Sequence, residues 1–162
     1  MGDAGAETVG LRPVRDSDLE IFYEQQREPE GVAMALFPTR ERDAFLHHWR
    51  TVTLARPDAR AMTVTCGDAV AGNIGSWEQD GRVLLGYWLG SAYWGRGIAT
   101  AALRSYLDEH EPRRPINAQV VATNLGSIRV LEKCGFELVG RETEYSEAFG
   151  VDVEELLMTR AR

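Results

Sequence analysis

The stretch from Leu84 to Leu103 constrains the fold more than any other part of this 162-residue chain. An apolar run ends at Leu89, and a short loop then leads through Gly95-Arg96-Gly97 into a helix-like segment that starts near Ile98. Glycine lets the backbone approach a ligand closely, and the first N–H groups of a helix lack an internal partner. A strand that delivers such a turn to a helix therefore predicts an anion site, here one for a pyrophosphate.

Two common nucleotide motifs do not match this turn. The chain has no G-x-x-x-x-G-K-[ST] run, which excludes a nucleotide P-loop. A dinucleotide fingerprint, G-x-G-x-x-G, breaks at Thr100, and the strand expected at 116–122 lacks the acidic residue that would bind a ribose. A nicotinamide-dependent oxidoreductase is thus disfavoured. A glycine turn that only connects a strand to a helix remains an open explanation.

Two motifs, one at this turn and one after it, resemble the GNAT superfamily of N-acetyltransferases. Trp94 to Ala99 is similar to its coenzyme A-binding motif, [Q/R]-x-x-G-x-[G/A], with Trp in the first position. Asn124 to Phe136 is similar to N-x-x-S-x-[RK]-V-L-E-K-x-G-F, a motif of the branch that resembles ribosomal-protein N-terminal (alanine/serine) acetyltransferases. The GYWL and YWG runs at 86–89 and 93–95 also match that branch. The resemblance extends from about Leu11 to the C-terminus.

Turn and cap residues divide the chain into the elements of one α/β (α+β) domain covering 1–162, with residues 1–8 flexible. We expect a mixed, mostly antiparallel sheet of about seven strands flanked by four helices, which is also what the resemblance implies. The expected strands are 9–14, 61–66, 69–77, 83–89, 116–122, 136–143 and 154–160, and the expected helices are 16–27, 39–55, 97–110 and 125–133. Residues 29–38 are expected to form an irregular apolar loop.

The resemblance implies a site for acetyl-CoA as cosubstrate and no metal. The pyrophosphate would lie over backbone N–H groups of the turn, and the pantetheine would pair with residues 87–89 as an added strand. Leu89 would polarise the thioester carbonyl through its N–H. For Asn124 a helix N-cap is an equally good role, and for Arg129, implied near the 3′-phosphate, so is a solvated helix face. The implied coenzyme-binding residues are Trp88, Leu89, Trp94, Gly95, Arg96, Gly97, Ile98, Ala99, Thr100, Asn124, Ser127 and Arg129.

The expected catalytic positions depart from the family pattern. Leu131 stands where many members have the tyrosine that protonates the leaving thiolate. Ser127, which the branch places near the sulfur, is therefore the candidate acid or thiolate donor. Leu84 stands where members of the branch often have glutamate, so Glu78, at the end of the preceding strand, is the candidate base. An ordinary surface acid explains Glu78 as well. The next candidates by position are Glu28 and Glu147.

Two functions remain open. A catalytic domain would move an acetyl group from acetyl-CoA directly to a primary amine, on a protein N-terminus or on a small molecule. The absent tyrosine and glutamate keep a non-catalytic acyl-CoA-binding sensor or partner domain as the alternative. Apolar side chains in and near the 29–38 loop indicate a partly hydrophobic acceptor pocket, although core packing explains them equally. These side chains are Met34, Leu36, Phe37, Trp49 and Trp77.

Composition sets the remaining expectations. A net charge of −7 argues against broad binding to nucleic acid, and no apolar run reaches the ~20 residues of a membrane span. No secretion signal is visible at the N-terminus, so a cytoplasmic location is the default. Cys66 and Cys134 are expected as buried free thiols, and the three histidines show no metal-ligand spacing. The terminal strand could pair between subunits, which leaves a homodimer open.

Overall fold

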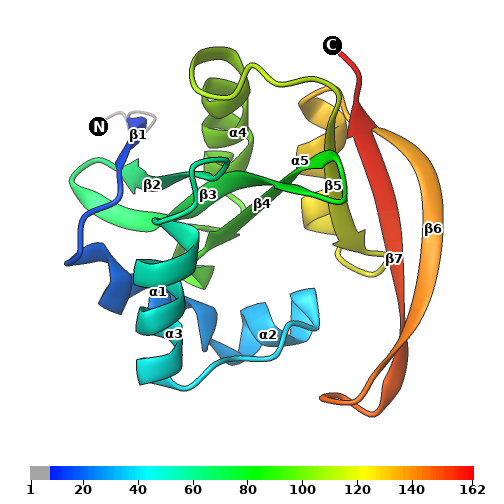
Figure 1. The fold of residues 1–162 in the computed structure, drawn as a ribbon, viewed down its shortest axis with the longest axis horizontal. Helices are drawn as coiled ribbons and strands as arrows, with labels where there is room; N and C mark the ends of the chain where they lie inside the picture. Colours follow the sequence, from blue (N-terminus) through cyan, green and yellow to red (C-terminus); the bar gives the residue numbers. More distant parts are fainter. Residues whose placement is uncertain (1–7) are drawn as a thin grey trace, which may run out of the picture.

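A seven-stranded sheet organises residues 8–162, the part of the chain that the computed structural model describes (Figure 1). Most of the segment 1–8, which we expected to be flexible, lies outside the described residues. The strands follow the spatial order β1-β2-β3-β4-β5-β7-β6. They are β1 (Val9–Pro13), β2 (Arg60–Cys66), β3 (Ala69–Gln79), β4 (Arg82–Leu89), β5 (Ile116–Val121), β6 (Glu137–Ser146) and β7 (Val151–Arg160).

The sheet separates between β4 and β5. These two strands run parallel, whereas the other neighbouring pairs are antiparallel. Val83–Leu85 pair with Ile116–Ala118, but β4 continues to Leu89 and β5 to Val121 without further pairing. Parallel strands need a long crossover, which here contains a helix. The carboxyl ends of β4 and β5 are therefore open edges in the middle of the sheet.

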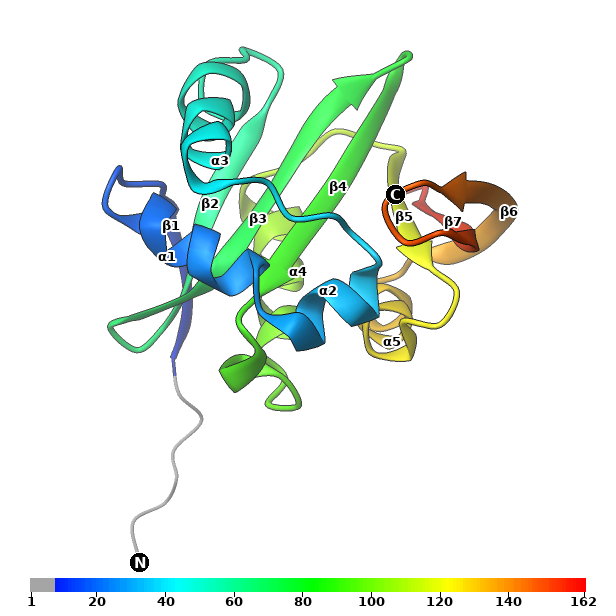
Figure 2. The same ribbon diagram turned by 90° about the horizontal axis from the view of Figure 1, so that it is seen from below.

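Helices cover both faces of the sheet (Figures 1 and 2). On one face lie α1 (Asp18–Gln26), α2 (Pro29–Ala35) and α3 (Arg42–His48); on the other lie α4 (Ile98–Glu109) and α5 (Leu125–Lys133). The helices turn apolar stripes to the sheet, because helical residues three and four apart share a face. In α4 this stripe is Ala102, Leu103, Tyr106 and Leu107, all buried. In α1 it is Leu19 and Phe22, which pack against Phe45 and Trp49.

The expected fold class is confirmed, but the described residues contain five α-helices rather than four. Most of the segment 29–38, expected to be an irregular loop, is α2. Pro29 begins this helix, where its fixed φ suits the first turn and its missing N–H would have no partner. Leu36 ends the helix in the left-handed conformation, with φ 47°. The apolar composition of this segment concealed these start and stop signals.

One predicted helix and the last two predicted strands differ most from their expected bounds. The helix expected over 39–55 starts only at Arg42, after an N-cap at Glu41 instead of Thr39, and it ends at His48. A π-helical turn, Trp49–Thr53, follows it. The last two strands extend beyond the expected 136–143 and 154–160, to Ser146 and back to Val151. Nearly all of β6 is exposed, so its outer half carries no alternation of apolar and polar residues from which a strand could be predicted.

Candidate functional site

The backbone of β4 turns N–H groups toward the place where β4 and β5 separate. Gly90 donates its N–H to the carbonyl of Ala71 on β3, at 2.9 Å. Successive residues of an antiparallel ladder direct their N–H groups to opposite edges of the strand. Leu89 and Tyr87 therefore direct theirs away from β3 and toward β5, beyond the last pair of the β4–β5 ladder. These amides are placed to bind a ligand that enters between the two strands.

The turn before α4 exposes further amides. Gly95 and Gly97 have φ angles of 71° and 74°, which glycine adopts without strain. A Cβ built on either would meet no atom of the described residues within 4 Å, so a ligand can approach the backbone. Gly97 is the N-cap, without a side-chain cap, and the helical ladder starts with Ala101 N–H donating to the Gly97 carbonyl at 3.1 Å. The N–H groups of Ile98, Ala99 and Thr100 therefore precede the ladder and carry the positive end of the helix dipole.

A cavity of about 440 Å³ joins this turn to the carboxyl end of β4 and to α5. All the predicted coenzyme-binding residues line it except Arg96. The Arg96 guanidinium instead lies 5.6 Å from the centre of the Tyr93 ring and donates to the Ala92 carbonyl at 3.3 Å. Lys133, which the sequence analysis missed, also lines this cavity, one turn after Arg129 on α5. Two cationic side chains thus lie on the α5 side of the cavity.

Trp94 and Asn124 each have a structural role as well. The indole Nε1 of Trp94 donates to the Leu89 carbonyl at 3.1 Å, which ties the turn to the end of β4. Asn124 is the N-cap of α5 and accepts a hydrogen bond from the Ser127 N–H at 3.3 Å. The capping role proposed for Asn124 on sequence grounds is therefore present. Asn124 also lines the cavity, so the cap does not exclude a contact with a ligand.

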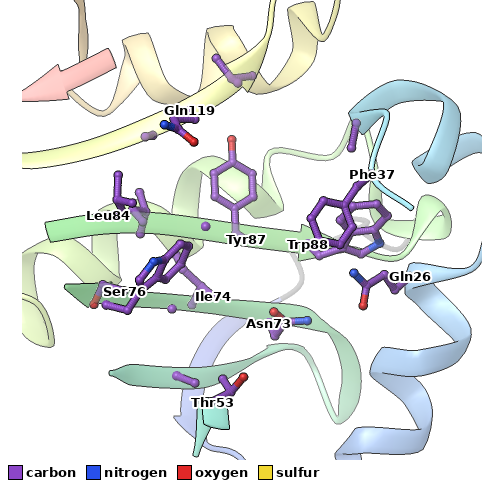
Figure 3. A pocket seen from close by; sticks show the side chains of 18 of the residues that line it. Gln26, Phe37, Thr53, Asn73, Ile74, Ser76, Leu84, Tyr87, Trp88 and Gln119 are labelled. Atoms are coloured by element: carbon purple, nitrogen blue, oxygen red, sulfur yellow. The ribbon is translucent and has the colours of Figure 1, made fainter. Parts of the chain in front are cut away.

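A second, larger cavity of about 610 Å³ extends from α1, α2 and α3 across β3 and β4 to β5, α5 and β7 (Figure 3). Of the apolar residues expected around an acceptor, Phe37, Trp49 and Trp77 line it. Met34 lines the smaller cavity, and Leu36 is part of neither lining. The wall combines aromatic and apolar side chains with polar ones, among them Arg40, Arg56 and Glu155, and a mixed lining of this kind suits a small molecule.

The two cavities meet at side chains from β4 and α5. The residues that line both are Ala35, Tyr87, Trp88, Asn124 and Ser127. At this junction the Tyr87 hydroxyl lies 2.6 Å from Ser127 Oγ. Burial raises the pKa of Tyr87 to about 12, so its phenol stays protonated at neutral pH. Sequence analysis singled out Ser127, whereas it gave Tyr87 a role only as part of the strand 87–89 that would pair with pantetheine.

The candidate acids lie in different surroundings. Glu78 is more than half exposed, and its carboxylate pairs with Arg113 at 3.3 Å. It is absent from the described linings of both cavities. Glu28 accepts from the Ser91 N–H at 3.0 Å and from the Ser91 hydroxyl at 2.8 Å, so its carboxylate fixes the turn that follows β4. Glu147 is exposed in the turn between β6 and β7.

Glu155 on β7 is the carboxylate that the sequence analysis missed. Among the described residues it is the only acid in the lining of either cavity. Burial raises its pKa, and so do the nearby charges of Glu144 and Glu142. Glu142 is its direct cross-strand partner on β6. His48, in the wall of the same cavity, has its pKa lowered by burial and by Arg40 and His47.

The described residues contain neither a helix that could span a membrane nor a cluster of side chains that could bind a metal. No helix within 8–162 is long and apolar enough to cross a membrane. Within the same range, no group of three or more histidine, cysteine or acidic side chains could hold a metal ion. Cys66 and Cys134 are buried, and neither forms a disulfide within the described residues, as expected.

Comparison of the sequence with known families and proteins gave partial matches. A family model described as an acetyltransferase (GNAT) domain matches residues 8–137. The probable N-acetyltransferase YjcK of Bacillus subtilis (strain 168) is 48% identical over 59 residues, which are 35% of this chain and 33% of YjcK. The uncharacterized N-acetyltransferase p20 of Bacillus licheniformis is 32% identical over 76 residues, 45% of this chain and 43% of p20. The matched segments thus span less than half of either relative.

Similar solved structures match nearly the whole chain. RimJ of Mycobacterium smegmatis, in complex with CoA-disulfide, has a TM-score of 0.78 and 24% identity, over 96% of this chain and 83% of RimJ. A GNAT acetyltransferase from Bacillus anthracis has a TM-score of 0.78 and 17% identity, over 96% of each chain. The aminoglycoside acetyltransferase AAC(6')-Ib, in complex with coenzyme A and kanamycin, has a TM-score of 0.76 and 20% identity, over 96% of this chain and 95% of that one. The likeness at these identities is one of fold.

Proposed function

This chain belongs to the GNAT acetyltransferase domain family, and on that premise we propose that it transfers an acetyl group from acetyl-CoA directly to a primary amine. One observation carries the proposal: two cavities meet at the open edge of β4. The smaller one has exposed amides and two cationic side chains, which suit the phosphates of coenzyme A. The larger one has the size and the wall of an acceptor site.

The residues around the smaller cavity fit coenzyme A. Backbone N–H groups at the α4 N-terminus, from Gly95 to Ala99, would hold the diphosphate, and the Thr100 hydroxyl lies in the same wall. Arg129 and Lys133 would contact a further phosphate. The open space around the two glycines supports this assignment, because a bound diphosphate needs close approach to the backbone.

The reacting groups would meet at the junction of the two cavities. The Leu89 N–H, directed into the gap between β4 and β5, would donate to the oxyanion that forms when the amine attacks the thioester. One such donor contributes about 3 kcal/mol to transition-state stabilisation. Ser127 would donate a hydrogen bond to the thioester sulfur while the bond between that sulfur and the acetyl carbon breaks. Trp88 lines both cavities and would help to enclose the reacting acetyl group.

We propose two alternative carboxylates as the base that removes the proton from the attacking amine. Glu78 is the candidate from the sequence, and Glu155 is the candidate from the structure. Glu155 lines the acceptor cavity, and its raised pKa makes it a better proton acceptor than an exposed glutamate. Glu78 would need to leave its ion pair with Arg113 or act through water.

The acceptor is proposed to be a cationic amine, either a protein N-terminus or a small molecule. Glu155 lies in the cavity wall, with Glu142 and Glu144 near it on β6, and the whole chain carries a net charge of −7. The same wall also contains Arg40 and Arg56, so the proposal of an ammonium group rests on Glu155 and on the negative charge of the whole chain. The sequence resembles ribosomal-protein N-terminal acetyltransferases, and one fold relative was crystallised with kanamycin, so peptides and aminoglycosides are the first two acceptor classes to screen.

The test is an acetylation screen with the full chain. Acetyl-CoA is mixed with peptides that have a free α-amine, polyamines or aminoglycosides, and both thiol release and the mass of the acceptor are measured. Each amine has an N-blocked analogue as its control. The proposal predicts thiol release that requires a free amine, with a mass gain of one acetyl group. Tight binding of acetyl-CoA without transfer to any amine would instead support the non-catalytic sensor.

A further inference from the structure

We propose that Tyr87 is a positioning residue for acetyl transfer: its hydroxyl donates to Ser127 Oγ, so that the Ser127 proton is left to bond the sulfur of the thioester. The inference rests on the proposed function and on the role proposed for Ser127. Tyr87 on β4 would act through Ser127 on α5, across the gap where β4 and β5 separate.

The geometry places Tyr87 for this role. Its ring projects from β4 toward β5, and its hydroxyl lies at the far end, away from β3 (Figure 3). The hydroxyl oxygen is 2.6 Å from Ser127 Oγ and 3.4 Å from the Ser127 carbonyl oxygen. The ring packs against the large core cluster, which limits its movement. Both side chains line both cavities, so the hydrogen bond between them lies where an acetyl group would pass from donor to acceptor.

Either hydroxyl could donate in this hydrogen bond, and the proposal assigns the donor to Tyr87 because Ser127 Oγ is its nearer acceptor. Each hydroxyl has one proton to donate. Both acceptors within reach of the Tyr87 hydroxyl belong to Ser127, and Oγ is nearer by 0.8 Å (3.4 against 2.6 Å). When Tyr87 donates to Oγ, the Ser127 proton is free for another acceptor in the cavity. With its pKa raised to about 12, Tyr87 remains a donor throughout the neutral range.

The reaction balances without a net loss of protons from either hydroxyl. The amine nitrogen forms a bond to the acetyl carbon, and the carbon–sulfur bond breaks with its electron pair on sulfur. The proton that the amine loses balances the one that the sulfur gains. Ser127 stabilises the negative charge on sulfur by its hydrogen bond, and Tyr87 holds Ser127 in that orientation. Leu131, one turn later on α5, is buried and aliphatic and supplies no donor.

A double-mutant cycle tests the inference. Ser127→Ala should lower kcat about tenfold or more, because a hydrogen bond to a charged group is lost. Tyr87→Phe should lower kcat about three- to tenfold and leave the KM for acetyl-CoA within about twofold, since the phenol acts in the transition state. In the Ser127→Ala background, Tyr87→Phe should change kcat by less than about twofold. Ser127→Thr keeps a hydroxyl and should restore the sensitivity to Tyr87→Phe.

The controls separate this inference from the proposed function. Tyr145→Phe is the control, because it removes the hydroxyl of a tyrosine on β6 that is 63% exposed, and it should leave kcat unchanged. Thermal unfolding of each variant shows whether it is folded. If Ser127→Ala has wild-type activity, the role of Ser127 is wrong and the inference falls with it. If Ser127→Ala is slow but Tyr87→Phe has no effect, or has the same effect in both backgrounds, Tyr87 does not act through Ser127 and the inference alone is overturned.

Discussion

At the scale of single residues, Gly97 combines a backbone conformation that favours glycine with a place in the wall of the smaller cavity. Its φ of 74° ends the turn and starts α4, and its Cα faces open space in the smaller cavity. Alanine at this position would bring a strain of about 1–2 kcal/mol and a methyl group where the diphosphate is proposed to lie. An alanine here would therefore affect both the stability of the fold and the binding of the coenzyme. The same substitution at a glycine outside the cavity would affect stability alone.

We predict that Gly97→Ala raises the Kd for coenzyme A at least about tenfold, as measured by calorimetry. Gly150→Ala is the matched control, because Gly150 has a φ of 67° and open space around it but lies in the β6–β7 turn, outside both linings. Both variants should lose similar stability, and only the first should lose affinity. Equal affinity in the two variants would contradict the proposed site at this turn.

Glu155 and Glu78 differ in the pH dependence that they predict. If Glu155 is the base, kcat/KM should fall on the acid side as its carboxylate becomes protonated, and Glu155→Gln should lower kcat at least about a hundredfold. Because the charge of Glu144 helps to raise the pKa of Glu155, Glu144→Gln should lower that pKa and move the acid limb to lower pH. pH–rate profiles of the variants and of Glu78→Gln make the comparison. Loss of the acid limb in Glu78→Gln, with Glu155→Gln unaffected, would assign the base to Glu78.

At the scale of elements, one buried carboxylate joins three of them. Asp18 at the start of α1 accepts from Arg12 of β1 at 2.6 and 2.9 Å, from the Arg15 N–H at 2.8 Å and from the Thr63 hydroxyl of β2 at 2.7 Å. Burial alone would raise its pKa, but these donors outweigh it and lower the pKa to about 2. The folded state therefore favours the ionised carboxylate, and Asp18 holds α1 against the edge of the sheet.

We predict that Asp18→Asn destabilises the fold by about 2 kcal/mol at pH 7, measured by urea unfolding. A carboxyl with a lowered pKa contributes stability above its unfolded value of about 3.9, and that contribution is lost as the pH falls toward 2. The difference between wild type and variant should accordingly shrink over that range. Asp16→Asn is the control: its pair with Arg50 is exposed and its loss should barely change stability. A pH-independent difference would contradict the ionic origin of the effect.

The elements also show where sequence patterns were sufficient. Strand β4, the glycine turn and α4 were predicted nearly to the residue, because apolar runs, glycines and a helical stripe mark them. The Pro29–Ala35 helix was not, since its apolar residues lack a clear period, and only Gly31 in it is buried. The outer halves of β6 and β7 pair with each other at an exposed end of the sheet, where Val153 is the one residue of the segments 142–146 and 151–155 that is buried, so their sequence has no alternating pattern.

At the scale of the whole molecule, the sequence predicted the lining of the smaller cavity better than that of the larger one. Motif residues lie close together in sequence at the turn and along α5, and Lys133 could have been found from its four-residue spacing after Arg129. Glu155 could not, because its place in the cavity depends on the register of β7 with β5 and on a bulge in β6 between Leu138 and Gly140. Tyr87 was visible in the sequence, but only the strand separation shows that its side chain reaches α5.

The short β4–β5 ladder has a mechanical consequence. Three residue pairs, at one end of the junction, join the half of the sheet that contains β1 to β4 with the half that contains β5 to β7. Past those pairs, side-chain packing rather than ladder bonds joins the two halves, because one core cluster contains residues of both. Under the proposed function, it is therefore this packing that sets the width of the opening through which an acceptor reaches the thioester.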